Sequence, residues 1–482
     1  MGPLKWGPDT LVRMFEPVIG LEVHLALRTR SKLFCGCSAE GFGLGPNTNV
    51  CPVCLGLPGS LPVVNHEALD LAISFALALG CDVAPVTRFH RKHYFYPDAP
   101  KNYQISQFDQ PIGLAGRITL GTGRTIGITR CHLEEDAGRL VHPTYVDHSL
   151  VDLNRAGAPL LEMVTEPDLR SPEEARDLLT EIRSVARALG VSDASPEEGK
   201  MRADVNISLR LPGGPFGTKV EVKNLNSFRN VANAIAFEMK RQSRLLEDGR
   251  AIEQETRGFN EGGQRTYTMR GKEGSADYRY LGDPDLPVVH VDEARRSALL
   301  AAMPELPAAK TSRYLALGVR PSDARQLAHD VEAARFFDAA VGSYGGPAQN
   351  VANWLNSDVM GILNQRETDI ATTALRPEAL AKLVTLIDQG VISGAIAKDL
   401  LPAVIDGHDP ATLVDERGLR QVTDGDQLTS LIDAVLDENA ELVDRVKANP
   451  KAINALLGAV MKASAGKAKP DLVREMLAQR FG

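Results

Sequence analysis

Apolar and polar residues alternate with a period of two at several places in the N-terminal part of the chain. The clearest run covers residues 19–27, and similar runs cover 204–209 and 219–223. Side chains on a strand point alternately to its two faces, so each run predicts a strand with one buried and one polar face. In the first strand Glu22 and His24 share the polar face.

Two helical segments interrupt these strands. Ser171-Pro-Glu-Glu174 forms a capping box with proline at the first helical position, which predicts a helix that ends at Gly190. A second helix is expected over about 227–248. Strands mixed with helices predict an α/β or α+β domain.

The pattern changes after the proline-rich segment 283–287. From Asp292 onward alanine and leucine recur at helical spacing, and prolines separate a series of short helices. This half is predicted to be all-helical, in two units joined near 406–410.

Composition and charge narrow the class of protein. The 482 residues are 43% hydrophobic and 24% charged, which is typical of soluble globular domains. No run of eighteen apolar residues and no signal peptide is present, so we expect a cytoplasmic protein without a membrane segment. The net charge of −8 argues against an overall basic surface.

The charge is nevertheless uneven near the C-terminus. Acidic residues dominate 411–444, whereas lysine and arginine dominate 446–482. The basic stretch suits a polyanion such as RNA, although a solvated charged surface would have the same composition.

Four of the six cysteines fall in one short segment, as Cys35-Gly-Cys37 and Cys51-Pro-Val-Cys54. Two thiol pairs joined by a glycine-rich and proline-rich loop are typical of a tetrahedral Zn²⁺ site. A disulfide pair or four unrelated thiols are the alternatives. Four thiolates leave no open position for a substrate, so the zinc would be structural.

Three polar groups are candidates for chemistry. Glu22 and His24 on one strand face could bind a cation, although such pairs are more often ordinary surface pairs. The run 132–136 contains Glu134, Glu135 and Asp136, which suits a divalent cation, although an exposed acidic turn is the more common origin of such a run. On the strand at 204–209, Asp204, Asn206 and Ser208 share one face, as solvent-facing polar residues also would.

Basic residues that could neutralise phosphate lie in two segments. Lys92 precedes an aromatic run at 94–96, and Arg270 and Lys272 follow the last predicted strands. No Gly-x-x-x-x-Gly-Lys-Ser/Thr loop and no Gly-x-Gly-x-x-Gly fingerprint occurs in the sequence, which argues against a Walker-type NTPase and a dinucleotide fold.

Several longer strings resemble the B subunit family of the heterotrimeric aspartyl/glutamyl-tRNA amidotransferases. They are Val18-Ile-Gly-Leu-Glu-Val-His24, Leu61-Pro-Val-Val-Asn65, Arg91-Lys-His-Tyr-Phe-Tyr-Pro-Asp98, Tyr103-Gln-Ile-Ser-Gln-Phe-Asp-Gln-Pro-Ile112, His132-Leu-Glu-Glu-Asp-Ala-Gly138 and Asp277-Tyr-Arg-Tyr280. The resemblance runs from about Phe15 to the C-terminus. It departs from the family at Leu281-Gly282, where Phe-Pro is usual.

The resemblance implies an ATP-dependent ligase component in protein biosynthesis. It implies that the chain phosphorylates the side-chain carboxylate of misacylated Glu-tRNA(Gln) or Asp-tRNA(Asn). Ammonia then reaches it from a partner amidase, the A subunit, in a complex with a small C subunit, which an aminoacyl-tRNA synthetase sometimes joins. The implied cofactors are ATP, Mg²⁺ and a structural Zn²⁺.

The resemblance also implies a domain order. After an extension over 1–14, a β-sheet cradle of glutamine synthetase and guanido kinase type would cover 15–292, with the zinc knuckle at 35–54. A helical linker would cover 293–408, and a YqeY-like tail that binds tRNA would cover 409–482. The fold class is therefore predicted as α+β.

By the same resemblance, Glu22, His24 and Glu135 would hold Mg²⁺ at the phosphorylation site. Strand alternation does not choose between Glu134 and Glu135, and the family favours Glu135. His24 is unusual for Mg²⁺ and could instead orient a carboxylate. The remaining expected site residues are Asp204 and Asn206 in the acidic shell, Lys92, Arg270 and Lys272 at the phosphates, and Lys447, Lys451, Lys462, Lys467 and Lys469 at the tRNA.

An acyl phosphate is lost to water, so we expect a closed path for ammonia toward Glu135, with Lys101 and Tyr103 along it. A non-catalytic, zinc-containing RNA-binding scaffold is the alternative function. The clustered acids argue against it, because a surface that binds RNA avoids carboxylates. A stand-alone amidotransferase is disfavoured, since neither an N-terminal cysteine nor a Gly-x-Ser-x-Gly elbow is present.

Overall fold

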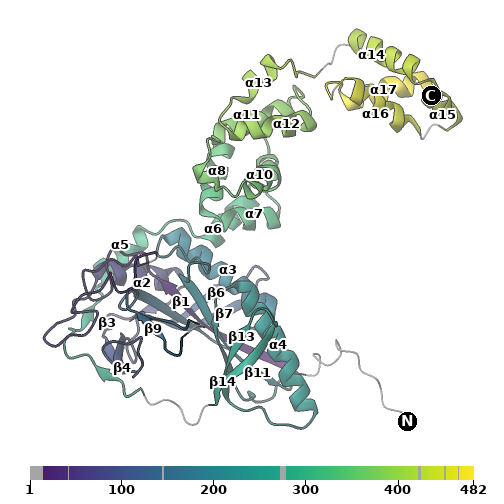
Figure 1. Cartoon of the computed structure of the whole chain (residues 1–482). Coiled ribbons are helices and arrows are strands. Elements are labelled where there is room, and N and C mark those ends of the chain that lie inside the picture. Colours follow the sequence, from purple (N-terminus) through teal and green to yellow (C-terminus); the bar gives the residue numbers. More distant parts are fainter. Residues whose placement is uncertain are drawn as a thin grey trace, which may run out of the picture. The chain divides into compact units, whose positions relative to one another are not determined.

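The computed structural model describes residues 15–41, 43–143, 146–271, 278–421, 425–449, 452–464 and 466–481 (Figure 1). The chain divides into two compact units, Met1–Pro307 and Ala308–Gly482. Strands and helices are mixed in the first unit, whereas the described part of the second is helical. The predicted extension over 1–14 lies outside the described residues.

A twelve-stranded sheet forms the centre of the first unit. In spatial order its main strands are β14 (Arg265–Gly271), β13 (Glu255–Asn260), β12 (Val220–Leu225), β11 (Met201–Arg210), β1 (Glu16–Ala26), β10 (Pro159–Thr165), β7 (Thr125–Glu135), β5 (Tyr103–Ser106), β4 (His90–His93) and β15 (Leu281–Gly282). Beside β7 also lies β6 (Gly113–Thr119), which pairs with β2 (Asp82–Val83). Neighbouring strands are antiparallel except β12 and β13.

Three helices pack on one face of this sheet (Figure 1): α2 (His66–Ala78), α3 (Pro172–Leu189) and α4 (Phe228–Glu247). The capping box is confirmed, because the Ser171 hydroxyl accepts a hydrogen bond from the Glu174 N–H. Helix α3 ends at Gly190, which adopts the left-handed φ of 70°. Ser227 caps α4 in the same way.

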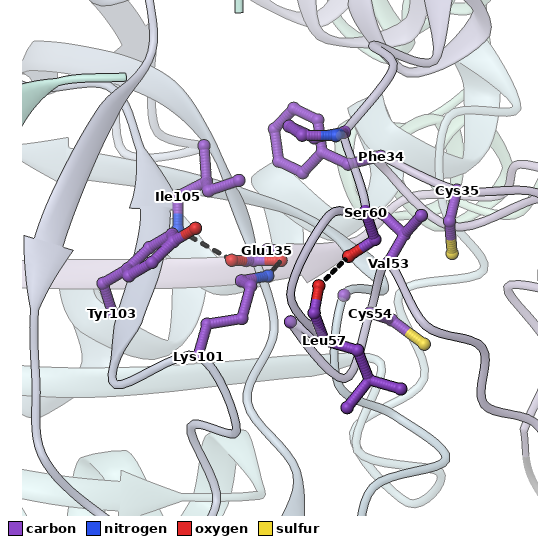
Figure 2. A pocket seen from close by; sticks show the side chains of 13 residues that line it. Phe34, Cys35, Val53, Cys54, Leu57, Ser60, Lys101, Tyr103, Ile105 and Glu135 are labelled. Atoms are coloured by element: carbon purple, nitrogen blue, oxygen red, sulfur yellow. Dashed lines mark hydrogen bonds and ion pairs between the residues drawn. The ribbon is translucent and has the colours of Figure 1, made fainter. Parts of the chain in front are cut away.

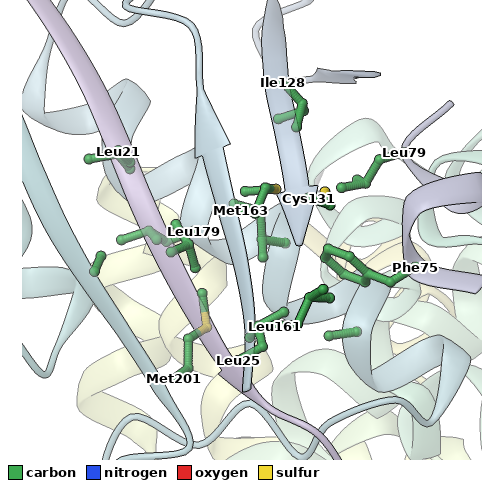
Figure 3. Packing of buried hydrophobic residues seen from close by; sticks show 14 of the residues in the cluster. Leu21, Leu25, Phe75, Leu79, Ile128, Cys131, Leu161, Met163, Leu179 and Met201 are labelled. Atoms are coloured by element: carbon green, nitrogen blue, oxygen red, sulfur yellow. The ribbon is translucent and has the colours of Figure 1, made fainter. Parts of the chain in front are cut away.

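The core between the sheet and the helices explains which strand residues face the other side. Leu21, Val23 and Leu25 of β1 are at most 1% exposed and pack with residues such as Leu161, Met163 and Leu179 (Figure 3). Burying each such side chain contributes about 1.5–3 kcal/mol. This burial fixes the orientation of β1, so Glu22 and His24 must point to the opposite face.

Smaller elements complete the first unit. They are β3 (Val86–Thr87) paired with β16 (Val289–His290), β8 (Arg139–Val141) paired with β9 (Leu150–Asp152), and α5 (Glu293–Ala301). Helix α5 contacts α2, and Arg295 Nε lies 2.6 Å from Asp70 Oδ1. The first helix after Asp292 therefore belongs to the first unit, whereas the sequence assigned it to the linker.

The second unit contains two separate apolar cores. Its helices are α6 (Pro307–Ala316), α7 (Pro321–Ala328), α8 (Val331–Gly342), α9 (Ala348–Asn353), a π-helical segment (Trp354–Val359), α10 (Met360–Gln365), a 3₁₀ turn (Ile370–Thr372), α11 (Pro377–Asp388), α12 (Gly394–Ile405), α13 (Pro410–Glu416), α14 (Gly425–Glu438), α15 (Ala440–Ala448), α16 (Ile453–Ala463) and α17 (Pro470–Phe481). One core extends from Tyr314 to Val414 and the other from Leu428 to Leu477. Leu413 and Val414 of α13 are buried in the first core, so the change of core comes later than the predicted boundary at 409.

Among the described helices, none is long and apolar enough to cross a membrane.

Candidate functional site

The polar face of the sheet carries a cluster of histidines and glutamates at its centre. His24 on β1 lies opposite Glu162 on β10, and Glu162 lies opposite His132 on β7. His24 Nε2 is 3.4 Å from a Glu162 oxygen and 4.0 Å from a Glu134 oxygen, and His132 Nε2 is 3.5 Å from Glu162. One atom each of His24, Glu134 and Glu162 lies within 4.8 Å of the others, close enough to share one metal ion.

The charges in this cluster are strongly coupled. Burial by itself raises the pKa of Glu162, but His132, His24 and Lys92 hold that pKa well below its usual range. Burial lowers the pKa of His24, yet the hydrogen bond and charge of Glu162 raise it overall. The Nδ1 atoms of His24 and His132 are buried without a hydrogen-bond partner. The cluster is thus rich in charge and incompletely satisfied.

A second acidic cluster begins at Glu22, two residues before His24 on β1. Glu22, Asp204 on β11 and Glu221 on β12 each offer an oxygen within 4.8 Å of the others. Asn206 Nδ2 donates a hydrogen bond to Glu22 at 2.9 Å, while its buried Oδ1 has no partner. The predicted association of Glu22, Asp204 and Asn206 is therefore present in the structure.

Two groups orient the second cluster. The Thr256 hydroxyl donates to Glu221 at 2.9 Å, and Lys223 Nζ lies 3.2 Å from Glu221 and 3.6 Å from Asp204. Burial lowers the pKa of Lys223, but the charges of Asp204 and Glu221 raise it overall. A protonated Lys223 stabilises three carboxylates that would otherwise repel each other.

Of the three predicted phosphate-binding side chains, the structure describes only that of Lys92. Lys92 faces the first cluster: burial lowers its pKa, but the charges of Glu134, Tyr280 and Glu162 raise it overall. Its Nζ also lies 4.9 Å from the centre of the Tyr278 ring. Arg270 pairs with Thr256 in the sheet, but its side chain and Lys272 lie outside the described residues.

Glu135 does not join His24, although the sequence placed it there. Successive strand residues face opposite sides, so Glu134 points to the His24 face and Glu135 to the other. The Glu135 carboxylate accepts hydrogen bonds from Lys101 Nζ at 2.5 Å and from the Ile105 N–H at 2.8 Å (Figure 2). The member of the pair beside His24 is Glu134.

Glu135 lines a cavity of about 190 Å³ next to the cysteine segment. Lys101, Tyr103 and Ile105 line it near Glu135, and Phe34, Cys35 and Cys54 also border it (Figure 2). The cavity thus contains the residues that the sequence placed on an ammonia path, on the sheet face opposite His24.

The four cysteines of 35–54 converge, each offering a sulfur within 4.8 Å of the others. None of these four is in a disulfide. The Cys51 N–H donates to Cys54 Sγ at 3.1 Å, and Lys32 Nζ lies 3.7 Å from the same sulfur. Hydrogen bonds from Cys35 and Cys51, and the Lys32 charge, lower the pKa of Cys54 to about 4. Convergence argues against four unrelated thiols, and the cluster could hold a metal.

The lysines predicted to bind tRNA lie on or beside the helices of the last apolar core. Lys447 is near the end of α15 and Lys462 near the end of α16, and both are exposed. Lys467 and Lys469 precede α17 and are partly buried. Lys451 lies outside the described residues.

Sequence reasoning missed several members of the two clusters. Glu162 was detectable as the one charged residue in the mostly apolar strand β10. Glu221 lies on the polar face of a predicted strand, where nothing local distinguishes it from its neighbours. Arg202, which bonds Asp136 at 3.0 Å beside His24, has no local signal either. Only the strand order brings these residues together.

Comparison with known proteins gives consistent matches over most of the chain. The family model described as the GatB/GatE catalytic domain matches residues 17–297, and a model described as the GatB domain matches 335–481. Both halves of the chain therefore resemble parts of the same kind of protein.

Three curated relatives are each named as the B subunit of an aspartyl/glutamyl-tRNA(Asn/Gln) amidotransferase. The Deinococcus radiodurans protein is 54% identical over 97% of this chain and 99% of its own length. A Thermus thermophilus protein is 51% identical over 97% of this chain and 100% of its own. The Synechocystis protein is 47% identical over 96% of this chain and 97% of its own.

Proposed function

The chain belongs to the family of aspartyl/glutamyl-tRNA(Asn/Gln) amidotransferase B subunits, and we propose that its sheet phosphorylates the substrate carboxylate. The substrates are Glu-tRNA(Gln), Asp-tRNA(Asn) or both, and the products are the corresponding amides. The observation that carries this proposal is the pair of adjacent acidic clusters on the polar sheet face, with Lys92 beside the first of them.

The donor sets fit divalent cations that accompany ATP. His24, Glu134 and Glu162 would hold one cation, and Glu22, Asp204 and Glu221 a second. Carboxylate oxygens are the ligands that Mg²⁺ prefers, and the unpartnered buried Oδ1 of Asn206 suits a cation or a water bound to it. When bound, Mg²⁺ neutralises phosphate charge and aligns the γ-phosphate.

The reaction then has two steps. A side-chain carboxylate oxygen of the aminoacyl group attacks the γ-phosphorus of ATP, and ADP leaves with the electron pair of the broken P–O bond. Ammonia next attacks the carbonyl carbon, loses a proton and expels phosphate. Lys92, with Arg270 and Lys272 as predicted partners, stabilises the negative charge that is transferred in the first step.

We place the ammonia path along the Lys101–Glu135 cavity. Its support is the location of this ion pair directly behind Glu134, one residue away on the same strand. The nitrogen would come from a partner amidase, the A subunit, in a complex with a small C subunit, and a synthetase could join the assembly.

The remaining assignments follow the family resemblance. The cradle would be of the glutamine synthetase and guanido kinase type, a helical linker would follow it, and the tail would be YqeY-like. Zn²⁺ would occupy the four-cysteine site, and the basic residues of 446–482 would bind tRNA. The unpaired cysteines suit a cytoplasmic location.

The test is tRNA-dependent ATP turnover by the assembled complex, supplied with Mg²⁺, ammonium chloride and either misacylated Glu-tRNA(Gln) or Glu-tRNA(Glu). We expect turnover only with the misacylated tRNA. Glu134→Gln should lower it at least about 100-fold, because the first cluster loses a carboxylate that would hold the cation accompanying ATP.

The matched control is Glu135→Gln, which changes the adjacent glutamate on the other face of β7. Under ammonium chloride it should keep turnover close to that of the wild type. Equal losses in both variants would contradict the separation of the two faces. A wild-type complex without ATP turnover would favour the scaffold alternative.

A further inference from the structure

The strand register aligns the residues of the polar face in rows. Arg130 on β7 lies opposite Val164 on β10, Val164 lies opposite Glu22 on β1, and Glu22 lies opposite Asp204 on β11. Directly paired residues of antiparallel strands share a face. Neighbouring strands are about 4.8 Å apart, so the backbones of Arg130 and Glu22 are separated by roughly 10 Å with Val164 between them.

Arg130, like Lys92, has no ion pair with an acidic side chain among the described residues, whereas two other cations around this face do. Arg202 is paired with Asp136, and Lys223 with Glu221. Arg130 Nε is buried and makes no hydrogen bond. Leaving a guanidinium nitrogen buried and unsatisfied costs free energy, which an anionic ligand would recover.

Other groups mark the space near Arg130 as part of the site. Arg130 precedes His132 and Glu134 on the same strand face. It is also near enough to Tyr280 for its charge to act on the phenol, together with Lys92, Glu134 and Glu162. Tyr280 stacks on Phe108 at 4.1 Å between ring centres. The guanidinium therefore lies on the strand face of the first cluster, close enough to Tyr280 for their charges to interact.

The proposed reaction brings two anions together, the triphosphate and the substrate carboxylate. The acidic clusters serve the triphosphate through its cations, and they repel a free carboxylate. A planar guanidinium binds a carboxylate with two parallel hydrogen bonds, and Val164 offers an apolar contact for the methylene groups next to it. Arg130 and Val164 together match an aspartyl or glutamyl side chain.

We propose that Arg130 binds the side-chain carboxylate of the amino acid esterified to tRNA and holds it for attack on the γ-phosphate. This inference rests on the proposed function. It assigns Arg130 to the aminoacyl group, whereas Lys92 and the acidic clusters serve ATP.

The experiment compares the wild-type complex with Arg130→Ala and Arg130→Lys, and uses Arg117→Ala as control. Arg117 is an exposed arginine on the neighbouring strand β6. Three quantities are measured: tRNA-dependent ATP turnover with ammonium chloride, ATP–Mg²⁺ binding by calorimetry, and turnover with added guanidinium chloride at millimolar concentration.

We expect Arg130→Ala to lower turnover about 100-fold or more while ATP binding changes less than about twofold. Guanidinium, but not methylammonium, should raise the turnover of this variant at least about tenfold, because only guanidinium restores the planar donor pair. A purely structural role for Arg130 would not produce this rescue. Arg117→Ala should resemble the wild type.

Three results would each overturn the inference. They are wild-type turnover in Arg130→Ala, loss of ATP binding in parallel with loss of turnover, and no rescue by guanidinium of the turnover of a folded Arg130→Ala variant. If Arg130→Ala unfolds at a lower temperature than the wild type, Arg130→Lys is the deciding variant. Turnover of Arg130→Lys should be at least about tenfold lower with ATP binding intact, because a lysine cannot supply the planar donor pair. Wild-type turnover of Arg130→Lys would overturn the inference. An inactive wild-type complex would instead refute the proposed function itself.

Discussion

At the residue scale, the direction of single side chains decides the chemistry of the sheet. Glu134 and Glu135 are adjacent in sequence, yet one faces His24 and the other accepts hydrogen bonds from Lys101 and Ile105. Successive side chains of a strand point to opposite faces, so two neighbouring carboxylates can belong to two different sites.

Gly56 provides a test of the compartment that contains Glu135. It adopts a φ of +66°, and a Cβ added there would clash with the Lys101 side chain at Cγ. Gly56→Ala should displace Lys101 from Glu135 and lower amide formation with glutamine at least about tenfold, because small misplacements are costly in a narrow path. Amide formation with ammonium chloride should change little, as measured by the yield of Gln-tRNA(Gln).

Gly59→Ala is the matched control for Gly56→Ala. Gly59 also has a positive φ, of +83°, but nothing lies within 4 Å of an added Cβ. Both variants carry the backbone strain, and only Gly56→Ala carries the clash. Equal behaviour of the two variants would show that the contact with Lys101 has no role in nitrogen transfer.

At the element scale, the cysteine segment is a short loop that leads directly to Gly56 at the cavity wall. Its described residues form turns, and one isolated bridge joins its Ser38 to Ser31 just before it. A segment of this kind is held by few backbone hydrogen bonds. A metal bound by four thiolates would stabilise it directly.

We therefore predict about one Zn²⁺ per chain by elemental analysis of the purified complex. Cys54→Ser should lose most of this zinc and lower the glutamine-dependent rate, because the loop beside Lys101 loses its anchor. Cys81→Ser, which changes a cysteine outside the cluster, should keep the zinc. A metal-free wild type with a disulfide in mass spectrometry would contradict the prediction.

At the scale of the whole molecule, the described residues form three separate apolar cores. The first contains the sheet with both acidic clusters, the second extends through α13, and the third contains α14 to α17. Among the described residues the last core shares no buried apolar side chain with the second, so its removal should leave the others folded.

A chain that ends at Gln421 should therefore assemble and bind ATP as the full chain does. Its KM for tRNA should rise about tenfold or more, because the lysines after 446 no longer contact phosphate. The measurement is a tRNA titration of ATP turnover at two salt concentrations. A full-length Lys447→Glu, Lys462→Glu variant should shift KM in the same direction, and an unchanged KM in both would exclude the tail from tRNA binding.

The sequence determined those features that depend on local pattern. Alternation of period two predicted the strand with Glu22 and His24 on its polar face, and the capping box predicted α3. The spacing of the cysteines predicted their convergence, since a short loop brings its own ends together at small entropic cost. Long specific strings predicted the family.

Only the tertiary structure decided which strands are neighbours. Strand β1 pairs with β10 and β11, which follow more than a hundred residues later in the chain, and this pairing brings Glu162 and Asp204 to His24 and Glu22. Local alternation fixes which face a side chain occupies but carries no information about the strand beside it. Register between distant strands depends on packing of the whole core, and that packing placed Glu134, not Glu135, in the site.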